Sequence, residues 1–486
     1  MILFFIGCSE QKPHEIIITG KISGEIPDKI TYTVPKEGLF VHGFKKETGL
    51  DSLGRYHIKI PVEKMAFVQL MVPNQSMATL IVEPGKEYIV NFDLKKGTDP
   101  HNYEILGDDN KIQKLYNQLP QPDHIQEAAG PLLKDSIASQ IQTKIANLKE
   151  EDLSEFKALL TKDSISQTMY NFIALDRDYY YSAVQGTVAF IKFLMDERQK
   201  GSFTENIKAM WKETFNNDLL TREDFQKTNW GYALAENYLF YKGYEDAAFD
   251  LAAFRNSLSD KFYPEMLLEN AEKHLSPPNL EYFKAVYLYM EMLEKEYQKE
   301  FIAIYDEFKI TYPNSSYSPY LEPMVATIVA FHKKAEQPFA QDIKFVENYN
   351  TITNFNDLLP HFKGKKIYID IWGTWCGPCK TEFQHKSDLD KLLKSKGVNA
   401  LYICEGRNSK EEAWKNMIKF YGLDGSHLIA NEALLTDIFN IFGNNGSFYY
   451  PRYILIDEEG NIAQSVAAKP SELDTLEEQI TAMELN

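Results

Sequence analysis

The sequence predicts a multi-domain chain with an N-terminal antiparallel β-sandwich, a central all-α region and a C-terminal α/β domain. At 486 residues, the chain is too long for a single domain of ordinary size. Short β-branched runs separated by turns fill residues 14–100, and apolar residues recur at three- and four-residue steps within 108–335. Strand-like and helix-like segments then alternate over residues 340–486, as an α/β domain requires.

Residues 1–13 are read as a lipoprotein signal remnant and tether. The apolar start ends in Phe5-Ile-Gly-Cys8 and turns polar at once, and this segment resembles a bacterial lipobox. The resemblance implies that Cys8 carries lipid, which anchors the protein in the cell envelope, facing the periplasm or the outer surface. The alternative is an apolar tail with an incidental cysteine.

Residues 14–100 are rich in β-branched or alternating runs, which favours strands. The runs are Glu15–Thr19, Lys29–Thr33, Tyr56–Ile60, Phe67–Met71, Thr79–Val82 and Glu87–Phe92. Pro84-Gly85 marks a turn before the last of them. Several short strands with regular turns predict a small antiparallel sandwich.

Residues 108–335 follow a helical pattern, clearest between Leu280 and Phe308. Pro277-Pro278-Asn279 precedes this stretch and Tyr312-Pro-Asn follows it, which predicts one helix between them. Its apolar positions are Phe283, Val286, Tyr287, Met290, Leu293, Tyr297, Phe301, Ile304 and Phe308. The pattern favours a helical-hairpin core over a peptide-binding groove.

The C-terminal domain contains a pair of cysteines, Cys376 and Cys379, where an apolar strand gives way to a helical pattern. Cys376 lies in the first helical turn, where unpaired backbone N–H groups and the helix dipole favour a thiolate. Cys379 follows one turn later and can reach back to the same sulfur. Gly377 and Pro378 suit that turn, because glycine permits a close approach and proline has no N–H to lose there.

This spacing predicts thiol–disulfide exchange. Cys376 attacks a substrate disulfide to form a mixed disulfide, and Cys379 then attacks Cys376 to release the reduced substrate. The alternative, a structural zinc half-site, requires a second Cys or His pair. The other cysteines are Cys8 and Cys404, and no such pair accompanies them. We therefore expect no metal, and no cofactor beyond the redox-active Cys376–Cys379 disulfide.

The run Trp372-Gly-Thr-Trp-Cys-Gly-Pro-Cys-Lys380 resembles the active-site segment of TlpA/ResA-like thiol–disulfide oxidoreductases of the thioredoxin family. The resemblance extends from near Phe345 to the C-terminus. It implies a thioredoxin fold, protein disulfide substrates and a membrane thiol as electron donor. Relatives usually carry a proline where this chain has Gln384, so the active-site helix is expected to run straighter.

Further positions match the family pattern. Asp370 precedes Cys376 by six residues, where relatives keep a buried carboxylate, and it is expected to accept the proton of Cys379. The alternative for Asp370 is an exposed position on the strand. Pro451 resembles the family's cis-proline, the alternative being an ordinary proline that begins a strand. Together with Trp375, Gly377, Pro378 and Tyr450, Pro451 is expected to form the substrate groove.

Three other features complete the predictions. Cys404 ends an apolar strand-like run and is read as a small buried hydrophobe, with a regulatory or resolving thiol as the alternative. Lys380 either favours thiolates electrostatically or is solvated. Residues 14–100, with the pattern Leu53-Gly-Arg-Tyr-His-Ile58, are similar to the β-rich domain of unknown function that often precedes thioredoxin domains in bacterial lipoproteins.

The acidic composition of the chain argues against one class of function. The chain holds 70 acidic and 52 basic residues, a net charge of −18, which argues against nucleic-acid binding. The leading hypothesis is an extracytoplasmic thiol–disulfide oxidoreductase, a reductase because Gly-Pro between the cysteines resembles reducing thioredoxins. The alternative is a cell-envelope binding or assembly lipoprotein whose dithiol serves one partner. A thiol peroxidase is disfavoured, because no separate peroxidatic cysteine motif is present.

Overall fold

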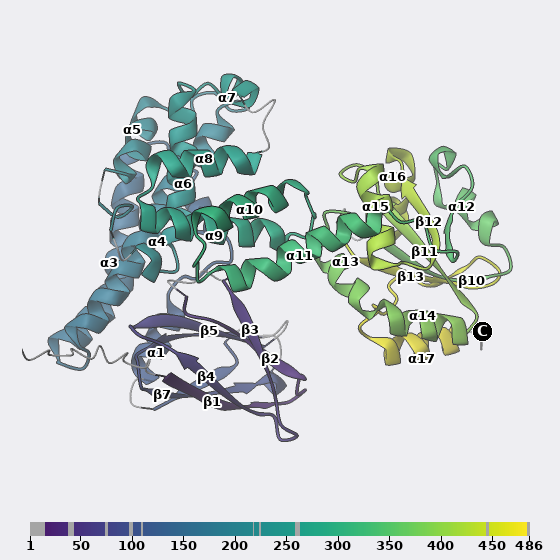
Figure 1. Cartoon of the computed structure of the whole chain (residues 1–486), viewed down its shortest axis with the longest axis horizontal. Helices are drawn as coiled ribbons and strands as arrows, with labels where there is room; N and C mark the ends of the chain where they lie inside the picture. Colours follow the sequence, from purple (N-terminus) through teal and green to yellow (C-terminus); the bar gives the residue numbers. More distant parts are fainter. Residues whose placement is uncertain are drawn as a thin grey trace, which may run out of the picture. The chain divides into compact units, whose positions relative to one another are not determined.

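The computed structural model describes residues 15–36, 43–72, 76–96, 101–107, 110–216, 218–222, 225–257, 263–443 and 447–483. The chain divides into two compact units, Met1–Val286 and Tyr287–Asn486 (Figure 1). The proposed lipid site, Cys8, lies outside the described residues. The domain boundary expected between residues 335 and 340 lies inside the second unit.

The first unit begins with a β-rich part made of two four-stranded sheets. One sheet has the order β4 (Arg55–Pro61), β1 (Glu15–Ser23), β7 (Glu87–Asp93) and β8 (Tyr103–Leu106). The other has the order β3 (Lys45–Gly49), β2 (Lys29–Thr33), β5 (Ala66–Val72) and β6 (Ser76–Val82). In β4, the alternation of exposed and buried residues directs Tyr56, Ile58 and Ile60 into a core that both sheets share.

The expectation of a β-rich N-terminal region is confirmed, but the expectation of purely antiparallel pairing is wrong for one pair. Strands β1 and β7 run parallel, with Ile17 opposite Glu87 and Ile22 opposite Phe92. The connection from β6 to β7 passes from one sheet to the other. Strand β7 therefore reaches β1 without a hairpin, which a pattern of local turns does not reveal.

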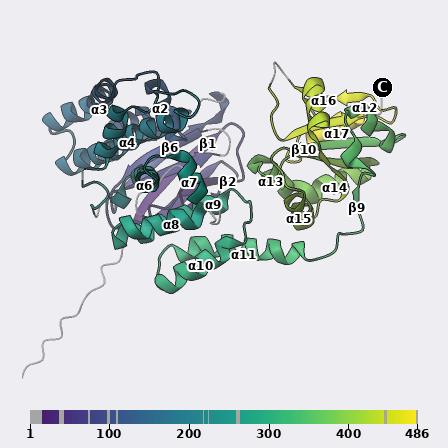
Figure 2. The ribbon, with the colours of Figure 1, turned by 90° about the horizontal axis from the view of Figure 1, so that it is seen from above.

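The rest of the first unit is helical, as predicted for this region. Its helices are α1 (Asn110–Gln118), α2 (Ile125–Ala129), α3 (Ala138–Thr161), α4 (Gln167–Met195), α5 (Glu205–Thr214), α6 (Gly231–Asp246), α7 (Leu251–Ser257), α8 (Tyr263–His274) and the first part of α9 (Pro277–Leu293). Figure 1 shows helices α4 to α9 above the two sheets, whereas α1 lies at the level of the strands; Figure 2 views the same unit from above. The Ser166 side chain caps α4 by accepting a hydrogen bond from the Met169 N–H.

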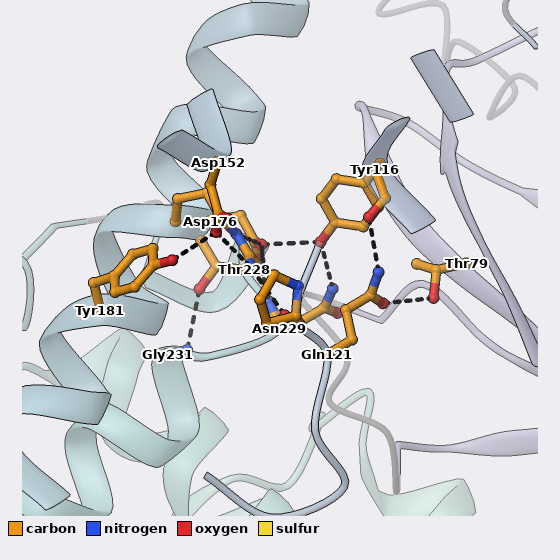
Figure 3. A network of polar contacts seen from close by, with 11 residues as sticks. Thr79, Tyr116, Gln121, Asp152, Asp176, Tyr181, Thr228, Asn229 and Gly231 are labelled. Atoms are coloured by element: carbon orange, nitrogen blue, oxygen red, sulfur yellow. Dashed lines mark hydrogen bonds and ion pairs between the residues drawn. The ribbon is translucent and has the colours of Figure 1, made fainter. Parts of the chain in front are cut away.

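A buried polar network joins the helices of this unit (Figure 3). Arg177 and Asp176, both fully buried on α4, form an ion pair of 2.6 Å between Nη2 and Oδ2. Tyr116 on α1 donates to Asp176 Oδ2 at 2.9 Å, and the backbone N–H of Asn229 donates to Oδ1 at 3.2 Å. Arg177 Nη1 also donates to the carbonyl of Pro120 at 3.1 Å. Because both charges have partners, the network fixes α1 and α4 relative to each other without leaving an uncompensated charge.

The prediction of a single helix between Leu280 and Phe308 is wrong. Helix α9 ends at Leu293, and α10 (Glu300–Thr311) and α11 (Ser318–Ala335) follow in the second unit. Between α9 and α10, Lys295 and Tyr297 have φ values of +53° and +57°, which no α-helix accommodates. Tyr297 leaves the helical path because its ring packs against Phe331, with ring centroids 4.6 Å apart.

The α/β part of the second unit is a six-stranded sheet of order β14-β13-β10-β11-β12-β9. Its strands are β9 (Ile343–Phe345), β10 (Lys366–Trp372), β11 (Val398–Glu405), β12 (Gly425–Ala430), β13 (Arg452–Ile456) and β14 (Ile462–Gln464). Its helices are α12 (Phe355–Leu358), α13 (Gly377–Glu382), α14 (Lys386–Ser395), α15 (Glu411–Tyr421), α16 (Glu432–Phe442) and α17 (Leu473–Met483). Strand β10 pairs in parallel with β11 and antiparallel with β13.

Alternation along β10 decides which helices cover each face of this sheet. Ile367, Ile369 and Ile371 point into a core shared with α12 and α16. Tyr368 points into the opposite core, shared with α14 and α17. Figure 1 shows the sheet between these two helical layers. The central strand is therefore buried on both faces, and its carboxyl end leads directly into α13.

The expectation of a straighter active-site helix is wrong. Helix α13 ends at Glu382, a short 3₁₀ turn covers Phe383–His385, and α14 begins at Lys386. Phe383 is buried against Trp372 and Tyr421, at ring-centroid distances of 5.2 Å and 5.0 Å. A 3₁₀ turn at this buried phenylalanine therefore separates α13 from α14, although the chain has Gln384 at the position where a proline is expected in relatives.

Candidate active site

The two cysteines lie at the junction of β10 and α13. The turn after Trp372 closes with a hydrogen bond from the Cys376 N–H to the Gly373 carbonyl at 3.0 Å. Cys376 is the N-cap of α13, and its Sγ accepts a hydrogen bond from the Cys379 N–H at 3.2 Å. The two residues form a disulfide, with Cα atoms 5.3 Å apart. When the disulfide is reduced, the same N–H favours a thiolate on Cys376.

Both cysteines of the disulfide are buried, whereas the neighbouring Trp375 is exposed to solvent. Cys376 is 2% exposed and Cys379 is fully buried, whereas Trp375 is 38% exposed. Gly377 and Pro378 form the first turn of α13 between the cysteines. Trp375 and Pro378 are therefore the exposed residues that flank the dithiol.

Asp370 lies on β10 with its side chain buried, so the alternative of an exposed strand residue is wrong. Its Oδ1 has no hydrogen-bond partner within the described part of the chain. Burial raises the pKa of Asp370 well above its ordinary value, and the nearby charge of Glu382 raises it further. Glu382 itself is held by Ser471, whose N–H and hydroxyl donate to the carboxylate.

The loop before β13 brings Tyr450 and Pro451 to the active-site turn. The Tyr450–Pro451 bond is cis, as expected for this position. The Tyr450 ring meets Trp375 edge-on, with centroids 5.3 Å apart. The next ring along the chain, Tyr449, is 72% exposed. Of the two tyrosines, only Tyr450 therefore lies against Trp375.

A cavity of about 400 Å³ opens beside this turn. It is lined by Trp375, Glu405, Arg407, Asn408, Phe439, Asn440, Ser447, Phe448 and Tyr450. The buried carboxylate of Glu405 fixes the tryptophan, because Oε2 accepts from Trp375 Nε1 at 3.0 Å and Oε1 accepts from the Arg407 N–H at 2.8 Å. The sequence predictions missed Glu405. Its position at the end of β11, beside the end of β10, is the signal that could have identified it.

Lys380 and Cys404 are both buried. The Nζ of Lys380 donates to the carbonyl of Glu294 at 2.8 Å, so of the two interpretations left open for this residue, the solvated lysine is wrong. Burial lowers the pKa of Lys380 to about 8. Cys404 is a free cysteine on β11, and burial raises the pKa of its thiol well above the ordinary value. A thiol in that environment behaves as a small hydrophobe.

Within the described residues, no group of three or more His, Cys, Asp or Glu side chains is placed to hold a metal ion. None of the described helices combines the length and apolar character needed to cross a membrane.

Comparisons with known proteins match the C-terminal part of the chain. A sequence model of the Redoxin family matches residues 334–480. "Thiol-disulfide oxidoreductase ResA" of Bacillus subtilis is 29% identical over 114 residues, which is 24% of this chain and 59% of that protein. The protein of the same name from Bacillus thuringiensis subsp. konkukian is 30% identical over 122 residues, 25% of this chain and 65% of that protein. The match thus covers less than two thirds of these relatives.

One solved structure is also similar in sequence. The solution structure of a putative thiol-disulfide oxidoreductase from Bacteroides vulgatus is 31% identical. The alignment covers 26% of this chain and 80% of that chain, with a TM-score of 0.22.

Proposed function

We propose that the protein is a thiol–disulfide oxidoreductase that acts on protein disulfides through a TlpA/ResA-like domain of the thioredoxin family, since residues 334–480 match the Redoxin family and the same part of the chain is similar to ResA proteins. One observation carries the proposal: Cys376 and Cys379 form a disulfide at the start of α13, directly after the buried strand β10. The same two sulfurs close and open in each cycle, so the reaction needs no further cofactor.

The proposed cycle assigns one task to each of three residues. The Cys376 thiolate attacks one sulfur of the substrate disulfide, that S–S bond breaks, and the other substrate sulfur leaves as a thiolate. Asp370 then takes the proton of Cys379. The resulting thiolate attacks Cys376 Sγ, and the bond between Cys376 and the substrate breaks. The substrate gains two electrons, and the Cys376–Cys379 disulfide forms again.

The substrate is proposed to bind across the turn that surrounds the dithiol. Trp375 is exposed there, Tyr450 packs against it, and Pro451 begins the segment leading into β13. Gly377 and Pro378 complete this surface on α13. The cavity lined by Phe439 and Phe448 lies beside it.

The assignment of Cys379 as the resolving thiol is tested by trapping. The Cys379→Ala variant is expected to form a mixed disulfide with insulin that persists until dithiothreitol is added, because no second thiol can attack Cys376. Mass spectrometry of the non-reduced mixture measures the adduct. Cys404→Ala, which removes a buried free cysteine, is the matched control and is expected to leave no persistent adduct. Absence of the adduct with Cys379→Ala would contradict the proposal.

The same variant distinguishes a general reductase from the alternative, an envelope binding or assembly lipoprotein with one partner. In that alternative, the sandwich expected over residues 14–100 and the helical region 108–335 would select the partner. Many trapped proteins from a cell-envelope extract favour the reductase, and a single one favours the dedicated role.

We further propose that the enzyme is a reductase outside the cytoplasm, lipid-anchored at Cys8 and supplied with electrons by a membrane thiol donor. The Gly377-Pro378 pair and the apolar run that ends at Cys8 support this. Equilibration with glutathione buffers measures the potential of the dithiol. A reductase is expected below about −200 mV, whereas a value near −120 mV would mark an oxidant.

A further inference from the structure

Asp370 is flanked by a tyrosine on each neighbouring strand. In the sheet register, Asp370 lies opposite Tyr402 on β11 and opposite Tyr453 on β13. All three side chains are buried. Asp370 Oδ1 and the hydroxyl oxygens of Tyr402 and Tyr453 each lack a hydrogen-bond partner within the described residues. An acceptor and two donors therefore share one buried region of the sheet.

Unpaired buried polar atoms are costly, so a group of them calls for an explanation. Burial raises the pKa values of Tyr402 and Tyr453 far above the ordinary range, and the nearby charge of Asp370 adds to this. Both hydroxyls therefore keep their protons at any ordinary pH. They can donate hydrogen bonds to a carboxylate, but they cannot take up its proton.

Other titratable groups face Asp370, but each of them either forms hydrogen bonds to another residue or remains neutral. On β10, the Tyr368 hydroxyl donates to the Ala468 carbonyl at 2.9 Å. On α13, Glu382 is held by Ser471, and its charge opposes ionisation of Asp370. On β11, burial raises the pKa of the Cys404 thiol.

One further group lies behind Tyr402. His427 on β12 stacks on the Tyr402 ring, with centroids 4.9 Å apart, and its Nε2 lies 2.9 Å from the Leu423 carbonyl. Burial lowers the pKa of His427 to about 4, so the imidazole is neutral near pH 7. Of the titratable groups around Asp370, Tyr402 and Tyr453 are thus the two with hydroxyl protons free to stabilise its charge.

We propose that Tyr402 and Tyr453 are positioning residues for the resolving step: in the reduced protein their hydroxyls turn to donate hydrogen bonds, absent from the disulfide form, to the Asp370 carboxylate before it receives the proton of Cys379. This rests on the proposed function. The proton moves from Cys379 Sγ to Asp370, and the sulfur's electron pair forms the bond to Cys376 Sγ. The Cys376–substrate bond breaks, and its electron pair leaves on the substrate sulfur. Both tyrosines keep their protons throughout.

The test is titration of Asp370 in the reduced full-length protein, followed by NMR of ¹³C-labelled aspartate carboxyls and assigned with Asp370→Asn. Removing a donor destabilises the carboxylate, so Tyr402→Phe and Tyr453→Phe are each expected to raise the midpoint by about one to two pH units. Phenylalanine keeps the ring and its packing. Tyr368→Phe is the matched control, because that hydroxyl is already bonded to Ala468, and its midpoint is expected to stay within about 0.3 units of wild type.

The pH dependence of the resolving step gives a second readout. Decay of the insulin mixed disulfide is expected to shift to higher pH by the same amount in both variants, whereas lost packing alone would slow it equally at every pH. An unchanged or lower Asp370 midpoint in both folded variants would overturn the inference. If one variant does not fold, the other decides. If the wild-type protein exchanges no disulfide, the proposed function fails, and the NMR titration still decides whether these hydroxyls stabilise the carboxylate.

Discussion

Replacing Cys376 by serine is expected to abolish the reduction of insulin disulfides by dithiothreitol in the presence of this protein. A serine hydroxyl is not ionised near neutral pH, so it cannot use the N–H of Cys379 that favours a thiolate at this position. Loss of a catalytic nucleophile commonly lowers rates by more than about 10³-fold, which here means the rate with dithiothreitol alone. The turbidity of precipitating insulin measures the rate.

Cys404→Ala is the matched control for this experiment as well. Cys404 is buried on β11 and forms no disulfide, so the variant is expected to keep the rate of the wild type. If Cys376→Ser retained insulin-reducing activity while remaining folded, Cys376 would not be the nucleophile and the mechanism would be wrong.

The dithiol could be predicted from sequence because its chemistry is local. Cys376 and Cys379 lie within one helical turn, and the apolar run before them identifies a buried strand. The burial of Asp370 follows from that same run, since residues on both sides of it are apolar. Neither prediction required knowledge of which strands are neighbours.

Features that depend on distant parts of the chain could not be predicted in this way. The helical pattern from Leu280 to Phe308 continues through Tyr297, but packing against Phe331 breaks the helix there. The carbonyl of Glu294, in the segment after this helix, accepts a hydrogen bond from Lys380, which is 86 residues away in sequence. Lys380 is therefore buried, although a solvated lysine was one of its two expected states. Tertiary contacts outweigh local periodicity in both cases.

The tyrosines beside Asp370 could be predicted from sequence only in part. Tyr402 and Tyr453 are each visible in a strand-like run. Their position beside Asp370, however, depends on the register of β11 and β13 against β10. A one-residue shift in either pairing would move a tyrosine to the opposite face of the sheet. Sequence analysis could therefore identify the residue that we propose as proton acceptor but not its neighbours.

Asp370→Asn is expected to slow the resolving step by about 10²- to 10⁴-fold, the usual contribution of a positioned general base. An amide cannot take the proton of Cys379, so the mixed disulfide with insulin is expected to accumulate as it does in Cys379→Ala. Attack by Cys376 precedes this proton transfer, and its rate is expected to change little. Rapid quenching with acid, followed by mass spectrometry, measures the two steps separately.

The same substitution is expected to stabilise the protein at neutral pH. Burial raises the pKa of Asp370 in the folded state, so the unfolded chain loses its proton first as pH rises, and the folded state loses stability between the two pKa values. Within that window the wild type loses about 1.4 kcal/mol of stability per pH unit, a loss that an asparagine, which does not titrate, avoids. Urea unfolding at pH 5, 6 and 7 measures the difference in unfolding free energy between Asp370→Asn and wild type.

The control is Asp388→Asn on α14, where the side chain is 63% exposed and no change of this difference with pH is expected. A constant difference across the three pH values would show that Asp370 is already ionised in the folded protein at pH 5, which would contradict a raised pKa for this carboxyl.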